Sequence, residues 1–312
     1  MTRYAAIDCG TNAIRLLIAD VMGGQLTEVT RRMLTVRLGE GIDATGEFSQ
    51  VALERTFSAV EDYAKEIERF DVRATRMVAT SASRDARNAD VFIEGVRRRL
   101  GINPEVVAGT EEAELSFIGA ARGLSASLLD SPLLIADIGG GSTEFVVGDA
   151  ASGVITSMCS VDVGCVRMTE RHLHDDPPTA EQVDQAVHTI DGILDQAFER
   201  VDISGVHTFV GLAGSVTTVA ALAHGLATYD PAAIHGSLVT FSQVEEVTDR
   251  LVRMARTERA AEPVMHPGRV DVIAGGALVL RQIMRRLPVH FVIASETDLL
   301  DGIVYRLAEK VA

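Results

Sequence analysis

The feature that constrains this chain most is the stretch 133–147, where an apolar strand pattern is broken by the glycine run Gly139–Gly141. The pattern predicts a β-hairpin with a bare turn, because glycines adopt positive φ and let backbone N–H groups approach a ligand. Asp137 and Glu144 flank the turn with hard oxygen ligands, and Ser142 adds a hydroxyl. This is typical of a loop that binds phosphate through amides and a divalent cation through carboxylates. An ordinary glycine turn with two solvated acids is the alternative.

The same pattern occurs earlier, in residues 4–22. An apolar strand ends at Asp8, a polar turn containing Gly10–Asn12 follows, and a second strand begins near Ile14. When Asp8 is laid on Asp137, the two copies are 129 residues apart. A repeat at this spacing predicts two similar domains, each with one phosphate loop that faces a shared cleft.

Three further polar groups follow expected strand ends. Arg84 comes just after a strand expected over 72–80, where α/β folds bind ligands, although a lone arginine there is usually solvated. The acidic run 109–114 leads into a helix expected over 115–123. The helix dipole favours these acids, and one of them could instead act as a general base. The turn 211–218 opens onto a helix N-terminus, which either binds an anion or is simply capped by its serine.

Composition excludes several classes of protein. A net charge of −15 over 312 residues argues against nonspecific nucleic-acid binding, which needs clustered Lys and Arg. No apolar run approaches the roughly 18–20 residues that span a bilayer, and the N-terminal residues lack the pattern of a signal peptide. Three cysteines without paired zinc spacing fit a reduced, cytoplasmic location.

These motifs, in this order, resemble the exopolyphosphatase and guanosine pentaphosphate phosphohydrolase (Ppx/GppA) family of the actin-like ATPase superfamily. The resemblance covers essentially the whole chain and implies an α/β fold. The protein would have two RNase H-like (actin-like) domains with mixed sheets flanked by helices, and an active site in the interdomain cleft. The domains would span 1–125 with a C-terminal helix at about 296–312, and 126–295. Seven segments carry the resemblance, at 8–15, 80–86, 109–113, 137–144, 164–170, 211–218 and 269–273.

The resemblance also implies roles for individual residues. Glu112 would be the general base, with Arg84 beside it in catalysis. Asp137 and Glu144 would hold Mg²⁺, for which Mn²⁺ could substitute. The family usually has serine or threonine where this chain has Ala13, which leaves its effect on substrate affinity open. The implied phosphate-binding residues are Gly10, Thr11, Asn12, Arg84, Gly139, Gly140, Gly141, Ser142 and Arg269.

The resulting hypothesis is an Mg²⁺-dependent exopolyphosphatase that hydrolyses the terminal phosphoanhydride bond of inorganic polyphosphate and releases orthophosphate. A pppGpp 5′-phosphohydrolase is the closest alternative, although a chain with no Trp and four Tyr shows no evident aromatic platform for guanine. A non-catalytic polyphosphate or alarmone sensor is the alternative from another class. Neither nucleic acid nor membrane is an expected partner. The preferred length of the polyphosphate chain stays open. The oligomeric state of the protein also stays open, and a homodimer is one expectation.

Overall fold

The computed structural model describes residues 2–311, and the chain divides into two compact units. The first unit comprises Met1–Gly119 together with Leu299–Ala312, and the second comprises Ala120–Asp298. Each unit contains one sheet that mixes parallel and antiparallel strands and packs against helices. The predicted fold class, α/β with two mixed sheets flanked by helices, is therefore confirmed.

The first unit is built from five strands and six helices within its described residues, the fifth helix, α5, ending beyond Gly119. They are β1 (Thr2–Cys9), β2 (Ala13–Met22), β3 (Gln25–Thr35), α1 (Ile42–Thr45), α2 (Gln50–Arg69), β4 (Ala74–Ala79), α3 (Ser81–Asp85), α4 (Ala89–Leu100), β5 (Glu105–Val106), α5 (Gly109–Gly123) and α13 (Leu299–Val311). The strand order is β3-β2-β1-β4-β5, with β1 parallel to β4 and antiparallel to β2.

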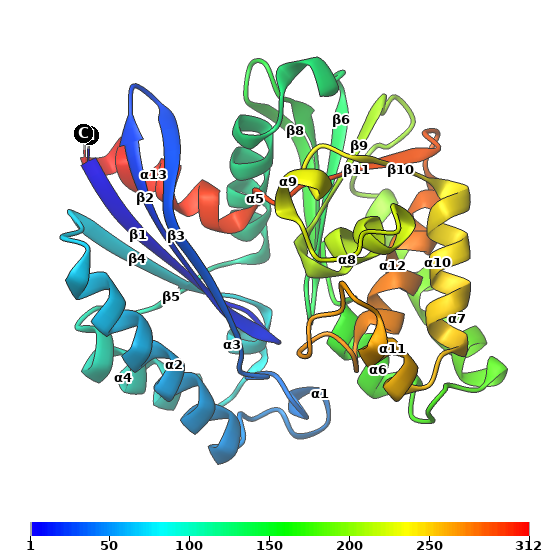
Figure 1. The fold of residues 1–312 in the computed structure, drawn as a ribbon, viewed down its shortest axis with the longest axis horizontal. Helices are drawn as coiled ribbons and strands as arrows, with labels where there is room; N and C mark the ends of the chain where they lie inside the picture. The colour runs from blue at the N-terminus through cyan, green and yellow to red at the C-terminus, as the bar shows by residue number, and fades with distance from the viewer. Residues whose placement is uncertain (1, 312) are drawn as a thin grey trace. The chain divides into compact units, whose positions relative to one another are not determined.

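Strand β1 is buried on both faces, which explains its nearly continuous apolar sequence. Alternate residues enter two different cores, because successive side chains of a strand point to opposite faces. Ala5 and Ile7 pack with residues of α2 and α4, whereas Tyr4 and Ala6 pack with residues of α13. Figure 1 shows α2 and α4 on one side of this sheet and α13 on the other.

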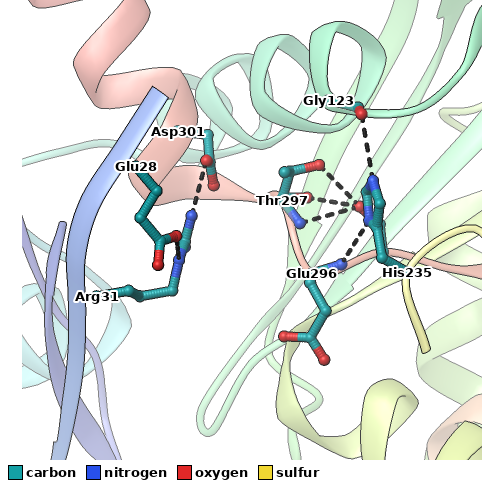
Figure 2. A network of polar contacts seen from close by, with 8 residues as sticks. Glu28, Arg31, Gly123, His235, Glu296, Thr297 and Asp301 are labelled. Carbon is teal, nitrogen blue, oxygen red and sulfur yellow. Dashed lines mark hydrogen bonds and ion pairs between the residues drawn. The ribbon is translucent and has the colours of Figure 1, made fainter. Parts of the chain in front are cut away.

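Helix α13 also makes a charged contact with the sheet of its unit. Arg31 on β3 donates a 2.8 Å hydrogen bond to Asp301 Oδ1, and it also pairs with Glu28 on the same strand (Figure 2). Asp301 is buried, so its carboxylate needs this cationic partner. The last helix is therefore fixed to the first unit by both apolar packing and an ion pair.

The second unit contains the remaining elements. They are a 3₁₀ turn at Ala126–Leu128, β6 (Leu133–Ile138), β7 (Thr143–Asp149), β8 (Val154–Val161), α6 (Cys165–His172), α7 (Ala180–Phe198), β9 (Thr208–Leu212), α8 (Ala213–Ala223), α9 (Pro231–Ile234), β10 (Leu238–Thr240), α10 (Phe241–Arg253), α11 (Arg256–Ala261), α12 (Ile273–Arg286) and β11 (Phe291–Ala294).

The sheet of the second unit repeats the plan of the first. Its order is β10-β11-β9-β6-β7-β8, so β6, β7, β8, β9 and β11 occupy the places of β1 to β5, and β10 is an added edge strand. The hairpins have matching registers, since Asp8 lies opposite Arg15 and Asp137 lies opposite Glu144. The two predicted glycine-turn hairpins are thus equivalent elements of two similar units.

One sequence-based element assignment was wrong. Helix α5 begins at Gly109, six residues before the expected start, so the acidic run lies inside the helix. Its first residues are polar, and tertiary contacts fix its start. Across residues 2–311, no helix combines the length and apolarity needed to cross a bilayer.

Candidate functional site

The turn of the first hairpin lies at the carboxyl end of β1, beside the end of β4. Thr80 N–H donates to Cys9 O across this edge, and Asn12 O accepts hydrogen bonds from Val36 and Arg37 N–H. Gly10–Asn12 is thus held from two sides. Asp8 is buried and accepts hydrogen bonds from Arg15 Nε and Nη2 at 3.0 and 2.7 Å, which makes this cross-strand pair electrically neutral.

Arg84 and Glu112 meet at the same sheet edge of the first unit. Arg84 Nη1 donates to Glu112 Oε2 at 2.7 Å and to Val107 O at 3.1 Å. Glu112 is only 7% exposed, and it lies in the first turn of α5. The structure therefore brings together the two residues predicted to be catalytic.

The other acids of the run are engaged elsewhere. Glu111 Oε1 accepts a hydrogen bond from Arg76 Nη2 at 2.6 Å, and Glu114 pairs with Arg306 on α13. Arg76 is itself buried and also binds Glu105. Of the three acids between which the sequence could not choose, Glu112 is the one beside Arg84.

In the second unit the carbonyls of the glycine run all point toward α6. Gly139 O accepts from Cys165 N–H, Gly140 O accepts from two N–H groups of the same helix, and Gly141 O accepts from Arg167 Nε at 2.7 Å. In a trans peptide the N–H points opposite to the C=O. The N–H groups of the residues that follow these carbonyls, Gly140 to Ser142, are therefore directed away from α6. This orientation suits the predicted binding of an anion by the loop.

Two buried carboxylates face one another at the base of this loop. Asp137 and Glu144 are cross-strand partners and are 6% and 1% exposed. Glu144 Oε1 accepts hydrogen bonds from Ser142 and Ser160 hydroxyls at 2.8 and 2.7 Å. Like charges placed directly opposite on a sheet are destabilising, and a cation bound between the two carboxylates would offset this repulsion.

The donor chemistry of this pair fits Mg²⁺. Two carboxylates are the usual protein contribution to a magnesium site, and water and substrate phosphate complete the octahedron. Within residues 2–311, no cluster of three or more His, Cys, Asp or Glu side chains could hold a metal by itself. A cation here would therefore depend on water and on phosphate oxygens for its remaining ligands.

Arg269 belongs to a second cluster of the same unit, at the start of α8. Its Nη1 donates to Thr218 Oγ1 at 2.9 Å, and its guanidinium fills the space that a side chain at Gly214 would need. The serine-cap interpretation of this turn was wrong. The N-cap residue is Leu212, and Ser215 lies inside the first turn of α8 against Gly276.

The comparisons with known proteins agree with this arrangement of motifs. A profile described as the Ppx/GppA phosphatase family matches residues 17–311. The chain belongs to the Ppx/GppA phosphatase family.

Relatives within the family match over nearly full length. A Mycobacterium tuberculosis protein named exopolyphosphatase 2 is 46% identical, with 99% of each chain covered. A solved structure of an exopolyphosphatase-like protein has 40% sequence identity and a TM-score of 0.96, and the match covers 100% of this chain and 99% of that protein's chain. A Ppx/GppA family structure from Aquifex aeolicus has 30% sequence identity and a TM-score of 0.83, and the match covers 99% of this chain and 98% of that chain.

Sequence reasoning gave no role to two arginines of this Ppx/GppA chain. Arg15 neutralises Asp8, and Arg167 binds the carbonyl of Gly141. The hairpin register could have revealed Arg15, because it stands seven residues after Asp8, as Glu144 stands seven after Asp137. Arg167 contacts a loop more than twenty residues away, which no local pattern indicates.

Proposed function

We propose that this chain is an exopolyphosphatase that removes terminal phosphates from inorganic polyphosphate as orthophosphate, with Mg²⁺ as cofactor. The substrate assignment rests on one observation, the 46% identity over 99% of both chains to the M. tuberculosis protein named exopolyphosphatase 2. The chemistry is supported by the contact between Glu112 and Arg84 and by the carboxylate pair Asp137 and Glu144.

Glu112 takes a proton from a water molecule that attacks the terminal phosphorus in line. The phosphoanhydride P–O bond breaks, orthophosphate leaves, and the shortened chain keeps the bridging oxygen. Arg84 orients the Glu112 carboxylate, and its guanidinium, which carries five N–H donors, can also contact a phosphate oxygen. General-base assistance of this kind contributes about 10²–10⁴-fold to rate.

Backbone N–H groups of Thr11 and Asn12 and of Gly140–Ser142 bind the substrate phosphates in this proposal. The N–H groups of Gly10 and Gly139 donate to Ala13 O and Ser142 O and so close the two turns. Asp137 and Glu144 hold the cation, which when bound neutralises negative charge on the phosphate oxygens. Arg269 binds the substrate further along its chain. The guanidinium lies at the N-terminal, positive end of α8. An anionic ligand bound there would offset both the charge of the arginine and the positive end of the helix dipole.

The test is orthophosphate release measured in parallel on short polyphosphate, long polyphosphate, pppGpp and ATP, with Mg²⁺, with Mn²⁺ and with a chelator. We expect polyphosphate to be hydrolysed fastest, and only when a divalent cation is present. Because the family includes GppA enzymes, pppGpp hydrolysis is the second candidate. Faster release from pppGpp than from polyphosphate would favour it. Tight binding of polyphosphate without release would instead indicate a sensor.

A further inference from the structure

The guanidinium of Arg269 occupies an unfavourable position that other residues must maintain. It lies at the N-terminus of α8, where the helix dipole repels a cation. Its Nη1 donates a hydrogen bond to Thr218 Oγ1, which contacts the guanidinium at its edge. Tyr229 provides a second contact, because the Arg269 Cζ atom lies 5.7 Å from the centroid of its ring. An aromatic face attracts a cation through its negative quadrupole.

The ring of Tyr229 is itself fixed through its hydroxyl. The hydroxyl donates to Glu296 Oε1 at 2.6 Å and lies 2.7 Å from Thr217 Oγ1. Burial, followed by the charge of Glu296, raises the pKa of Tyr229 to about 12, so the hydroxyl keeps its proton at neutral pH. Thr217 is the neighbour of Thr218 on α8, so one helix turn anchors both the arginine and the tyrosine.

The carboxylate that receives the tyrosine hydroxyl belongs to a fixed segment of the second unit. The Glu296 backbone N–H donates to His235 Nδ1 at 3.2 Å (Figure 2). The other ring nitrogen, Nε2, lies 3.2 Å from Gly123 O, so the imidazole joins the end of α5 to the segment after β11. Tyr229 therefore connects Arg269 to α8 and to the segment after β11, which His235 in turn joins to the end of α5.

We propose that Tyr229 is a positioning residue that holds the Arg269 guanidinium in the orientation required to bind a phosphate of the substrate. The inference rests on the proposed function and deepens it. The tyrosine acts only through the arginine. The ring of Tyr229 is thus in contact with a cation of the protein itself, and this contact differs from the guanine stacking considered for the tyrosines above.

The test compares Tyr229→Leu, which removes ring and hydroxyl, with Tyr229→Phe, which keeps the ring. For Tyr229→Leu we expect KM for polyphosphate to rise about 3- to 10-fold with kcat within twofold, since the lost contact is a cation–π interaction. Tyr229→Phe should restore most of the affinity. The rise in KM should also shrink at high salt, because the contact of Arg269 with phosphate is screened.

A double-mutant cycle separates positioning from a general structural role. In an Arg269→Ala background, Tyr229→Leu should change KM less than twofold. An equal rise in KM in both backgrounds, or no rise in the wild-type background with the variant folded, would overturn the proposal. Thermal unfolding shows whether each variant is folded. If Tyr229→Leu does not fold, Tyr229→Met, which fills the site without an aromatic face, must show the same dependence on Arg269 for the proposal to stand.

Failure of the proposed function would be recognised separately. It would appear as absence of orthophosphate release by the wild-type protein. In that case tripolyphosphate is titrated calorimetrically into the same variants, and Tyr229→Leu should weaken binding about 3- to 10-fold only where Arg269 is present. Binding that is unchanged by Tyr229→Leu would show that the tyrosine does not position the arginine.

Discussion

The residue seven positions after the hairpin aspartate distinguishes the two turns. In the first hairpin it is Arg15, which forms an ion pair with Asp8. In the second it is Glu144, which adds a second negative charge beside Asp137. The same backbone register therefore places opposite charges side by side in one unit and two acidic side chains side by side in the other. This difference explains why the proposed metal ligands come from one hairpin only.

Neutralising one member of each pair should have opposite effects on stability. Without divalent cations, Glu144→Gln should raise the free energy of unfolding by up to about 1 kcal/mol, because it removes like-charge repulsion and keeps the oxygen that accepts from the serines. Asp8→Asn should lower it by about 1–3 kcal/mol, because Arg15 loses its charge partner. Urea unfolding in chelator and in Mg²⁺ measures both.

The cation dependence supplies the control for this comparison. Mg²⁺ should stabilise the wild-type protein and Asp8→Asn, and it should stabilise Glu144→Gln much less. If Glu144→Gln destabilised the cation-free protein as much as Asp8→Asn does, the repulsion between Asp137 and Glu144 would be disproved.

Glu112→Gln should lower kcat for orthophosphate release by about 10²–10⁴-fold, because the amide cannot accept the proton of water. Substrate affinity should change little, since the glutamine can still accept the hydrogen bond from Arg84. The matched control is Glu111→Gln, the neighbouring residue whose carboxylate binds Arg76. Steady-state phosphate release checks both variants. A kcat for Glu112→Gln near that of wild type would exclude this residue as the base.

At the scale of elements, the glycine loop is held in place by helix α6. Its carbonyls accept hydrogen bonds from the N-terminal residues of that helix, and the helix is preceded by Gly164. A Cβ atom at Gly164 would come within 2.6 Å of the Gly140 carbonyl carbon. The absence of a side chain at this position is what allows the helix and the loop to approach so closely.

Gly164→Ala should therefore displace the loop and raise KM or lower kcat by at least tenfold, with a loss of about 1–3 kcal/mol in stability from overpacking. Gly192→Ala is the matched control, because nothing lies within 4 Å of a Cβ at Gly192 in α7. It should stabilise the protein by up to about 1 kcal/mol, since alanine favours helix over glycine. Phosphate release and thermal unfolding distinguish the two. Full activity of Gly164→Ala would contradict the close-contact argument.

The hairpins could be predicted because their information is local. Alternating and continuous apolar runs mark the strands, and the aspartate and glycines mark the turns. The start of α5 was missed because its first residues are polar and are fixed by Arg76 and Arg84, which are distant in sequence. Helix α6 was not predicted, because the carbonyls that bind its first N–H groups come from Gly139 and Gly140, which are distant in sequence. The contact of Arg84 with Glu112 likewise depends on tertiary structure, and only the identity of the two residues could be proposed from the sequence.

At the scale of the whole molecule, the first unit is discontinuous in sequence. Residues 1–119 form it only together with the segment that contains α13. Several apolar residues of that helix are fully buried against β1 and β2, among them Leu300, Ile303 and Val304. Burying one such side chain stabilises a fold by about 1.5–3 kcal/mol, so the helix contributes as much as the entire stability of many domains.

A chain that ends at Asp298 should therefore lose the first unit and keep the second. Hydrogen exchange followed by mass spectrometry should show fast exchange in β1, β2 and β4, and slow exchange in β6, β7 and β9. A chain that ends at Lys310 is the control, because Val311 is exposed. Equal protection of β1 in both truncated chains would show that α13 is dispensable.

The return of the chain to its first unit also sets the order of folding during synthesis. A ribosome adds about 5–20 residues per second, so the second unit takes roughly 10–35 s to appear after the first. Throughout that time residues 1–119 lack the helix that covers one face of their sheet. The unit whose strands are made first is thus completed last, and Tyr4 and Ala6 of the nascent β1 stay uncovered until α13 has been made.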